Sequence, residues 1–294
     1  MPGPDEKFKK VKIHPFYAQK GDAGRNKILI FLRELEKSAK ITILENGTIS
    51  VEGNVILKPQ VWQKIPVKFV EVTGDFIVAR NHLGIGASTE SRLEALDGCP
   101  ERVGGLFDVS ENQIITLDYG PKQVGALKAR NCKLENLNGI PVVTTGNIML
   151  DKNKNLKSLK GSPSEADIFS VANCDLKNLE GAPQKTTSFD CSNNENLKSL
   201  IGGPDECNSF VCTNTSIENL EGAPKKVLSI DFSNNKKIIS LKGLPIGDNI
   251  MYKYDGIPSI TKKTFDDYMH EVKAQEKYNK KDLDDYFGID ITDF

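Results

Sequence analysis

The side chains most capable of chemistry in this sequence are six cysteines and three histidines. No two cysteines form a CxxC pair, and no cysteine and histidine are spaced like zinc ligands. His14, His82 and His270 come from three separate segments, and no HExxH, Walker or GxSxG motif is present. We therefore expect no catalytic centre, no bound metal and no cofactor.

One segment has a faint likeness to a phosphate-binding loop. Gly84-Ile-Gly-Ala-Ser88 carries two glycines, but it lacks the full glycine spacing and does not open an expected helix. It lies in an insertion between Leu83 and Arg92. We interpret the insertion as a surface excursion. Because inserted loops often carry partner contacts, the segment 84–92 remains a candidate binding element.

Composition narrows the classes of partner. The 294 residues include 39 basic and 40 acidic side chains, with a net charge of −1, 38% hydrophobic and 7% aromatic residues. This balance gives no electrostatic reason to expect nucleic acid or an anionic membrane as the main partner. No apolar run approaches the ~20 residues that span a bilayer, and the first residues lack the order of a secretory signal. We expect a soluble, cytoplasmic protein.

The elements that position these residues follow from an internal repeat. A Leu-x-Gly-x-Pro signal recurs at intervals of 20 to 22 residues along the middle of the chain. Its prolines are Pro100, Pro121, Pro141, Pro163, Pro183, Pro204, Pro224 and Pro245.

Between these anchors lies a second repeated signal, of which Phe189-Asp-Cys-Ser-Asn-Asn194 is an example. Apolar and polar residues alternate and then close on a hydrogen-bonding side chain. Alternation with a period of two predicts a short strand with one buried face. The closing residues are Asn112, Cys132, Asn153, Cys174, Asn194, Thr215 and Asn235.

The pattern resembles the leucine-rich repeat at its short length. More narrowly, it is similar to leucine-rich-repeat proteins encoded by large T-even-like tailed bacteriophages. The segments that carry this resemblance are Leu179-Glu-Gly-Ala-Pro183, Phe189–Asn194, Leu220-Glu-Gly-Ala-Pro224 and Ile65-Pro-Val67, within about residues 41 to 250. Met149, Ala166 and the pair Thr186-Thr187 depart from the cleaner repeats of those proteins.

The resemblance implies a leucine-rich-repeat solenoid with short parallel strands on a concave face and a ladder of hydrogen bonds from the closing side chains. So short a repeat, with a recurrent proline, leaves an extended or turn-like convex side rather than helices. The resemblance also implies a phage origin. Because no catalytic constellation is present, we expect a non-enzymatic module that binds a host or phage protein during infection, to inhibit a defence factor or to modulate replication. A structural or assembly component of the virion is the alternative.

The repeat gives the cysteines a structural interpretation. Cys191 and Cys212 fall at inward strand positions, Cys132 and Cys174 at the closing position, and Cys207 where other repeats carry valine. Cys99 alone has a variable position. Buried thiols behave as small hydrophobic groups and are unreactive, so we expect these cysteines to belong to the core.

A solenoid exposes its core at both ends, so caps are required. We expect residues 1–64 to form an N-terminal cap, with an irregular start of about 25 residues, a helix over Arg25–Lys40 and a hairpin over Ile41–Val51. Asn46-Gly47 predicts a type I′ turn in that hairpin, and Val55–Leu57 a third strand. The solenoid covers 65–250, a C-terminal capping helix 251–278, with its helix at Thr261–Tyr278, and an acidic-aromatic tail 279–294.

The outward strand residues are the first candidate surface for a protein partner. Two rows point away from the expected core, and they lack the basic and aromatic density expected for nucleic acid. The candidates in these rows are Asp108, Lys128, Met149, Asp190, Val211 and Asp231, followed by Arg130 and Asp151.

The tail is the second candidate surface. It mixes acidic and bulky apolar residues and ends in a Phe carboxylate, like terminal peptides that dock on replication clamps or are presented by single-strand-binding proteins. An apolar pocket with a basic rim could hold such a peptide; a packed or unordered terminus is the alternative. The candidate residues are Asp285, Tyr286, Phe287, Asp293 and Phe294.

Overall fold

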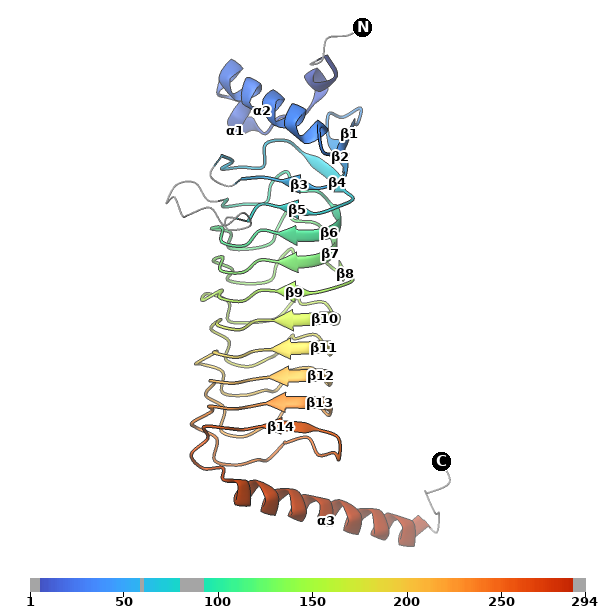
Figure 1. The fold of residues 1–294 in the computed structure, drawn as a ribbon, viewed down its shortest axis with the longest axis vertical. Helices are drawn as coiled ribbons and strands as arrows, with labels where there is room; N and C mark the ends of the chain where they lie inside the picture. The colour runs from blue at the N-terminus through green and yellow to red at the C-terminus, as the bar shows by residue number, and fades with distance from the viewer. Residues whose placement is uncertain (1–5, 59–60, 80–92, 288–294) are drawn as a thin grey trace.

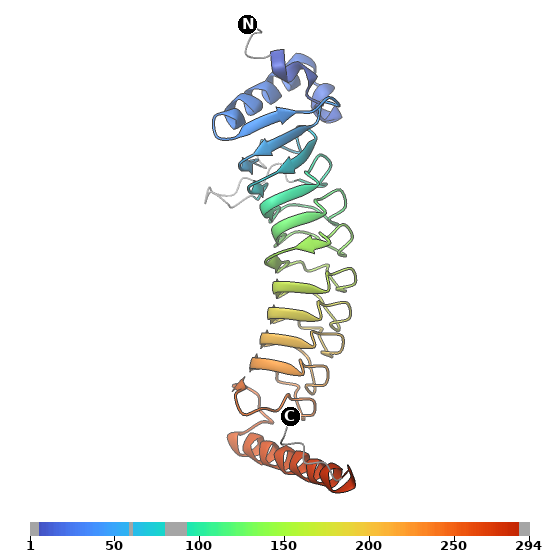
Figure 2. The same ribbon diagram turned by 90° about the vertical axis from the view of Figure 1, so that its right-hand side faces the viewer.

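The computed structural model describes residues 6–58, 61–79 and 93–287, without the side chains of 276–287. Its main part is a long column in which short strands stack on one side and turns on the other (Figures 1 and 2). The helical elements are η1 (Glu6–Lys10), α1 (Pro15–Ala18), α2 (Gly21–Glu36) and α3 (Lys262–Phe287). The strands are β1 (Lys40–Ile43), β2 (Ile49–Glu52), β3 (Val55–Ile56), β4 (Phe69–Val72), β5 (Phe76–Ile77), β6 (Arg102–Asp108), β7 (Gln123–Lys128), β8 (Val143–Thr144), β9 (Ile148–Met149), β10 (Glu165–Ser170), β11 (Lys185–Asp190), β12 (Glu206–Val211), β13 (Lys226–Asp231) and β14 (Met251–Lys253).

The strands form one sheet that is parallel from β2 onward, which confirms the predicted solenoid. Strands β10 to β13 stay in register, so that Phe169, Phe189 and Phe210 lie opposite one another. In the preceding coil, β8 and β9 replace one strand, and β7 pairs with both. The face of this sheet that points to solvent is called the strand face below.

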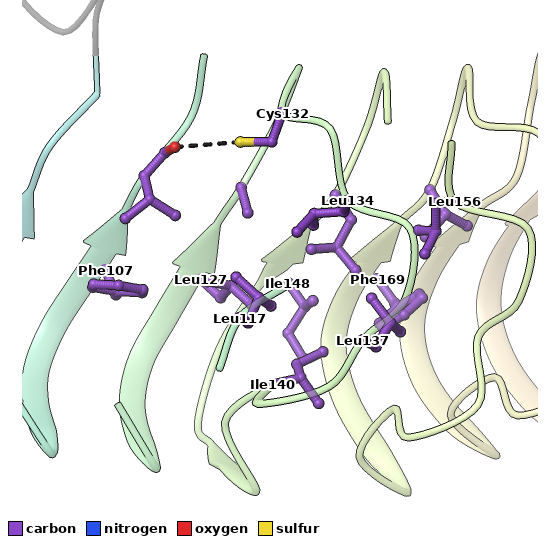
Figure 3. Close-up of a cluster of buried hydrophobic side chains, with 14 of the residues drawn as sticks. Phe107, Leu117, Leu127, Cys132, Leu134, Leu137, Ile140, Ile148, Leu156 and Phe169 are labelled. Atoms are coloured by element: carbon purple, nitrogen blue, oxygen red, sulfur yellow. Dashed lines mark hydrogen bonds between the residues drawn. The ribbon is translucent and has the colours of Figure 1, made fainter. Parts of the chain in front are cut away.

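The core fills the narrow space between the strands and the turns (Figure 3). Strand residues such as Leu127 and Ile148 meet the anchor leucines, such as Leu137, from the turn side of each coil. The phenyl rings of Phe169, Phe189 and Phe210 stack with centroids 5.6 Å apart. Each coil therefore buries its apolar residues both between its own strand and turns and against the neighbouring coils.

The N-terminal cap is more ordered than the sequence suggested. Residues 6–20 contain η1 and α1, and Phe8 and Tyr17 are buried in the core. The Tyr17 hydroxyl donates to the Lys64 carbonyl at 3.0 Å, and its ring packs edge-to-face on Trp62. The expected irregular start is therefore wrong, because these aromatic anchors attach it to the first coil. Helix α2 also begins and ends earlier than expected, at Gly21 and Glu36.

The hairpin of β1 and β2 is confirmed, but its turn is not type I′. Leu44 and Thr48 close the loop through a backbone bond of 2.9 Å, leaving three residues, Glu45-Asn46-Gly47, in the turn. Within the turn, Gly47 alone has a positive φ, of +79°. The Asn46 side chain instead accepts bonds from Thr48, which favours the longer loop. Strand β3 follows but pairs with β5, not with the hairpin.

The turn side carries no helix between β1 and α3 in the described part of the chain, as the short repeat predicted. Two left-handed positions per coil reverse the chain there. Glycine occupies one of them in seven coils, with φ between +77° and +97°, whereas Tyr119 stands at this position with φ +65°. The other precedes the closing residue and is mostly asparagine, which tolerates this conformation.

The C-terminal cap is the beginning of α3. The Phe265 ring stacks on Tyr254 at 4.4 Å and meets Tyr252 edge-on, and Tyr268 and Met269 are partly buried against the core. The helix continues through residue 279, where a tail was expected to begin, as far as Phe287. Figure 1 shows it extending beyond the width of the column.

Candidate functional site

The six cysteines lie in the core, where the repeat placed most of them. Burial raises the pKa of Cys132 and Cys174 to about 12 and raises that of the other four thiols as well. The thiol of Cys132 donates to the Val109 carbonyl at 3.3 Å (Figure 3). Cys207 stands in register with Val227, as expected. The thiols are held protonated and away from solvent, in a structural role.

The histidines are scattered. His14 caps α1 by accepting from the Phe16 amide at 3.1 Å, and burial lowers its pKa. His270 lies on an exposed part of α3, while His82 and the candidate insertion 84–92 lie outside the described residues. Among the described residues, no group of three or more His, Cys, Asp or Glu side chains is placed to hold a metal ion.

The closing asparagines form the ladder that the resemblance implied. Asn194 donates to the carbonyls of Val171, in the preceding coil, and Cys191, in its own, at 2.9 and 2.8 Å. Its Oδ1 accepts from the Leu176 amide at 3.1 Å. Asn112, Asn153 and Asn235 repeat this arrangement, and all four side chains are buried. The ladder satisfies backbone groups that could not reach water.

A second ladder on the turn side was not predicted. Three residues before the left-handed position that glycine mostly occupies, a short polar side chain accepts a hydrogen bond from the backbone amide two residues ahead. Asn178, for example, accepts from Glu180 at 3.1 Å. The equivalent residues are Thr116, Asn136, Ser158, Ser199, Asn219 and Ser240. A Ser, Thr or Asn residue stands immediately before seven of the eight anchor leucines, and this recurrence was the signal that could have revealed it.

The first predicted outward row has a partly structural role. The carboxylates of Asp108, Asp190 and Asp231 accept from the amide two residues ahead at 2.9 to 3.0 Å, which turns the chain at the end of each strand. Lys128 and Val211, from the same row, are partly exposed and make no such bond. Met149 is also partly exposed. The aspartates thus contribute to the scaffold, and the other three side chains are available to a partner.

The second predicted row is more buried than expected. Arg130 Nε and Asp151 Oδ2 are 2.6 Å apart, and Ser170 donates to the other oxygen of Asp151. Because Asp151 is buried, this pair ties two coils together, and only Arg130 presents polar surface. The predicted tail residues Asp285, Tyr286 and Phe287 belong to α3, without described side chains, and Asp293 and Phe294 lie outside the described residues.

The strand face also contains a hollow that the sequence did not suggest. Two adjoining cavities, of about 370 and 460 Å³, lie over the first halves of β10 to β13 and share Lys185, Thr186 and Asn208. Together they form a trough that crosses the strands along the column, here called the axial trough. It runs from Thr144 to Ile250.

One residue pair from each strand borders the axial trough. The first residue of each pair is charged, with alternating sign in neighbouring coils, and the second residue is mostly uncharged. The pairs are Glu165 and Asp167, Lys185 and Thr187, Glu206 and Asn208, and Lys226 and Leu228.

Several side chains of the axial trough have no partner within the described structure. Glu165, Asp167, Thr187 and Asn208 make no side-chain hydrogen bond or ion pair with any described residue. On its floor, the hydroxyl of Thr186 is buried beside the Cys207 thiol. Burial raises the pKa of that thiol and the hydroxyl offsets part of the rise, but the hydroxyl has no hydrogen-bond partner of good geometry. Buried polar groups are normally satisfied, so unused bonding capacity gathers here.

Sequence reasoning missed the axial trough because it treated inward and outward residues as strictly alternating. In β11, for example, Thr187 and Ser188 are two consecutive residues that are not buried, between the buried Thr186 and Phe189. The pair Thr186-Thr187, a departure from the cleaner repeats, was the signal at hand.

The geometry defines the class of the protein as a parallel-strand β-solenoid with helical caps. Searches against protein-family models, curated proteins and solved structures found no match to this chain. In the described part of the chain, no helix is both long and apolar enough to cross a membrane.

Proposed function

We propose that this chain is a non-enzymatic protein-binding module of the leucine-rich-repeat type, with the strand face as its binding surface. The observation that carries the proposal is the contrast in bonding across each coil. On the turn side, the short Asn, Ser and Thr side chains of the two ladders bond to the backbone. On the strand face, the side chains of Glu165, Asp167, Thr187 and Asn208 gather at the axial trough without a partner in the described structure. Stacked parallel strands that present such rows are typical binding surfaces of solenoids.

The repeat resemblance supports two finer parts of the proposal. It favours a tailed-phage origin and a partner that is a host or phage protein met during infection. The near-neutral charge and the carboxylates on the strand face favour a protein over nucleic acid. A virion component remains the alternative, and abundant copies of the chain in purified particles would favour it.

Affinity capture with matched variants tests the proposal. The strand-face variant carries Lys128→Glu and Val211→Arg, and the turn-side control carries Lys157→Glu and Lys198→Glu at exposed positions. We expect one stoichiometric protein with the wild type and the control, and at least a tenfold loss with the strand-face variant. Equal recovery on all three would refute the strand face. A chain ending at Asn279 would lose the partner only if the tail is the binding site.

A further inference from the structure

We propose that the axial trough binds an extended polypeptide segment of the partner, about seven residues long, lying along the column. This inference rests on the proposed protein-binding function and names the part of the partner that is recognised. The axial trough is only one part of the strand face. It crosses the first halves of the strands, whereas the two outward rows predicted from the sequence lie at and after the strand ends.

The width of the axial trough selects an extended chain. Its two borders come from residues such as Glu165 and Asp167, which stand two apart on one strand and so about 7 Å apart. An α-helix with side chains is about 10 to 12 Å wide and would lie above the borders rather than between them. A single extended backbone fits the space.

The length of the axial trough sets the size of the segment. It spans six consecutive coils, from Thr144 to Ile250, and neighbouring strands are about 4.8 Å apart. Five such steps make about 24 Å, which an extended chain covers with about seven residues at roughly 3.3 Å each.

The chemistry of the borders matches a peptide. Asp167, Thr187 and Asn208 offer donors and acceptors to backbone amides, and none of them is engaged within the described chain. Glu165 and Lys185 offer opposite charges one coil apart. A polyanion would meet Glu165, Asp167 and nearby Glu206, so a nucleic acid does not suit the surface.

The C-terminal end of the axial trough is apolar and supplies an anchor. Leu228 is 55% exposed, and Ile246 and Ile250 line the same cavity while partly packed on the core. Lys226, at this end, forms an ion pair with Glu206, which lowers the pKa of that carboxyl. The expected segment therefore carries a large apolar side chain at one end and charged residues of both signs along its length.

A random library of linear seven-residue peptides, acetylated and amidated at the ends, is a suitable probe. Peptides are selected on the full chain and measured against Asn208→Trp, which fills the trough from an exposed position, and against Lys198→Trp on the turn side. We expect selected peptides to bind the wild type and Lys198→Trp equally, and Asn208→Trp at least tenfold more weakly. Unchanged melting temperatures establish that both variants fold. Equal binding of the selected peptides to Asn208→Trp would overturn the proposal. So would a selection in which peptides bind the full chain no better than the glycans of an array tested in parallel.

Two further variants test the recognition chemistry. Leu228→Asp should weaken selected peptides about tenfold, while Ile201→Asp, at a turn-side residue 58% exposed, should not. Exchanging charges by Glu165→Lys with Lys185→Glu keeps the net charge and should move the preferred acidic residue by about one coil. An unchanged preference would contradict peptide binding in the trough. Loss of the captured partner in the strand-face variant but not in Asn208→Trp would refute the trough while leaving the proposed function intact.

Discussion

Two asparagines in neighbouring coils illustrate how differently the two sides of this solenoid are used. Asn194 is fully buried, and its side chain bonds to Val171 and Leu176 in the preceding coil and to Cys191 in its own. Asn208 is exposed at the border of the axial trough, and its side chain bonds to no described residue. The same residue type is scaffold in one place and available surface in the other.

The difference shows how a repeat protein separates stability from recognition. Groups that recur in every coil are satisfied by the next coil, so their conservation within the chain reflects the cost of an unpaired buried amide or carbonyl. Groups that vary from coil to coil, such as Thr187, Asn208 and Leu228, occupy equivalent positions without a structural partner. Variation along one position of the repeat is therefore the better indication of a binding site.

The largest expected contrast is in thiol reactivity. At pH 8 an aromatic disulfide reagent should leave all six native cysteines unmodified, because burial raises the pKa of Cys132 and Cys174 from 9.0 to about 12 and so lowers their thiolate fraction about a thousandfold. The variant Asn208→Cys should add one fast-reacting thiol. Rapid modification of more than one native thiol would contradict the buried assignment.

The same shifts predict an alkaline limit of stability. The folded pKa of Cys132 and Cys174 lies above the value of 9.0 for the free thiol, so unfolded chains lose these protons first as the pH rises. Their contribution is fully present below about pH 9 and is lost as the pH rises from 9 towards 12. Urea midpoints measured between pH 7 and 11 should fall in the upper half of this range, and a flat profile would contradict the prediction.

The ladder should give the largest loss of folding free energy. In Asn194→Ala the Leu176 amide and the carbonyls of Val171 and Cys191 lose this partner. The free energy of unfolding should therefore fall by about 3 to 5 kcal/mol in total. Asn208→Ala, the matched change at the axial trough, should stay within about 0.5 kcal/mol. Urea denaturation of both variants measures the contrast. Similar losses would mean that the two asparagines do not differ in role.

Much of this scaffold could be predicted from the sequence, for an identifiable reason. The period of the repeat and the alternation of apolar and polar residues indicate which side chains are buried. The anchor leucines, the closing asparagines and the parallel solenoid were therefore all recognisable. The attachment of the first residues through Tyr17 was not, because it depends on a contact with Lys64, far along the chain. The site was harder still. The predicted aspartates prove to cap strand ends, and the axial trough exists only through the register of four separate strands.

Substitutions at the left-handed turn positions should change stability by smaller amounts, and in opposite directions at Gly181 and Tyr119. At Gly181, with φ +87°, an alanine Cβ would lie 2.7 Å from Lys160 Cα, and left-handed strain adds about 1 to 2 kcal/mol. We expect Gly181→Ala to destabilise by about 2 to 3 kcal/mol. Tyr119, 73% exposed at the equivalent position, carries this strain already, so Tyr119→Gly should stabilise by roughly 1 kcal/mol. Thermal unfolding measures both changes, and a destabilised Tyr119→Gly would reveal packing by the tyrosine ring that outweighs the strain.

The second ladder should give the smallest effect, because its members are nearer to solvent. Asn178→Ala removes the acceptor for the Glu180 amide, which water can partly replace, so the expected loss is about 0.5 to 1 kcal/mol. Asn178→Ser should recover most of it, since Ser158 and Ser199 accept the same bond in their own coils. Lys177→Ala, at the exposed neighbour, is the control for a change in surface charge. If Asn178→Ser were as unstable as Asn178→Ala, the turn would depend on the amide group itself rather than on the oxygen it presents. The recurrence of Ser, Thr and Asn before the anchor leucines would then require another explanation.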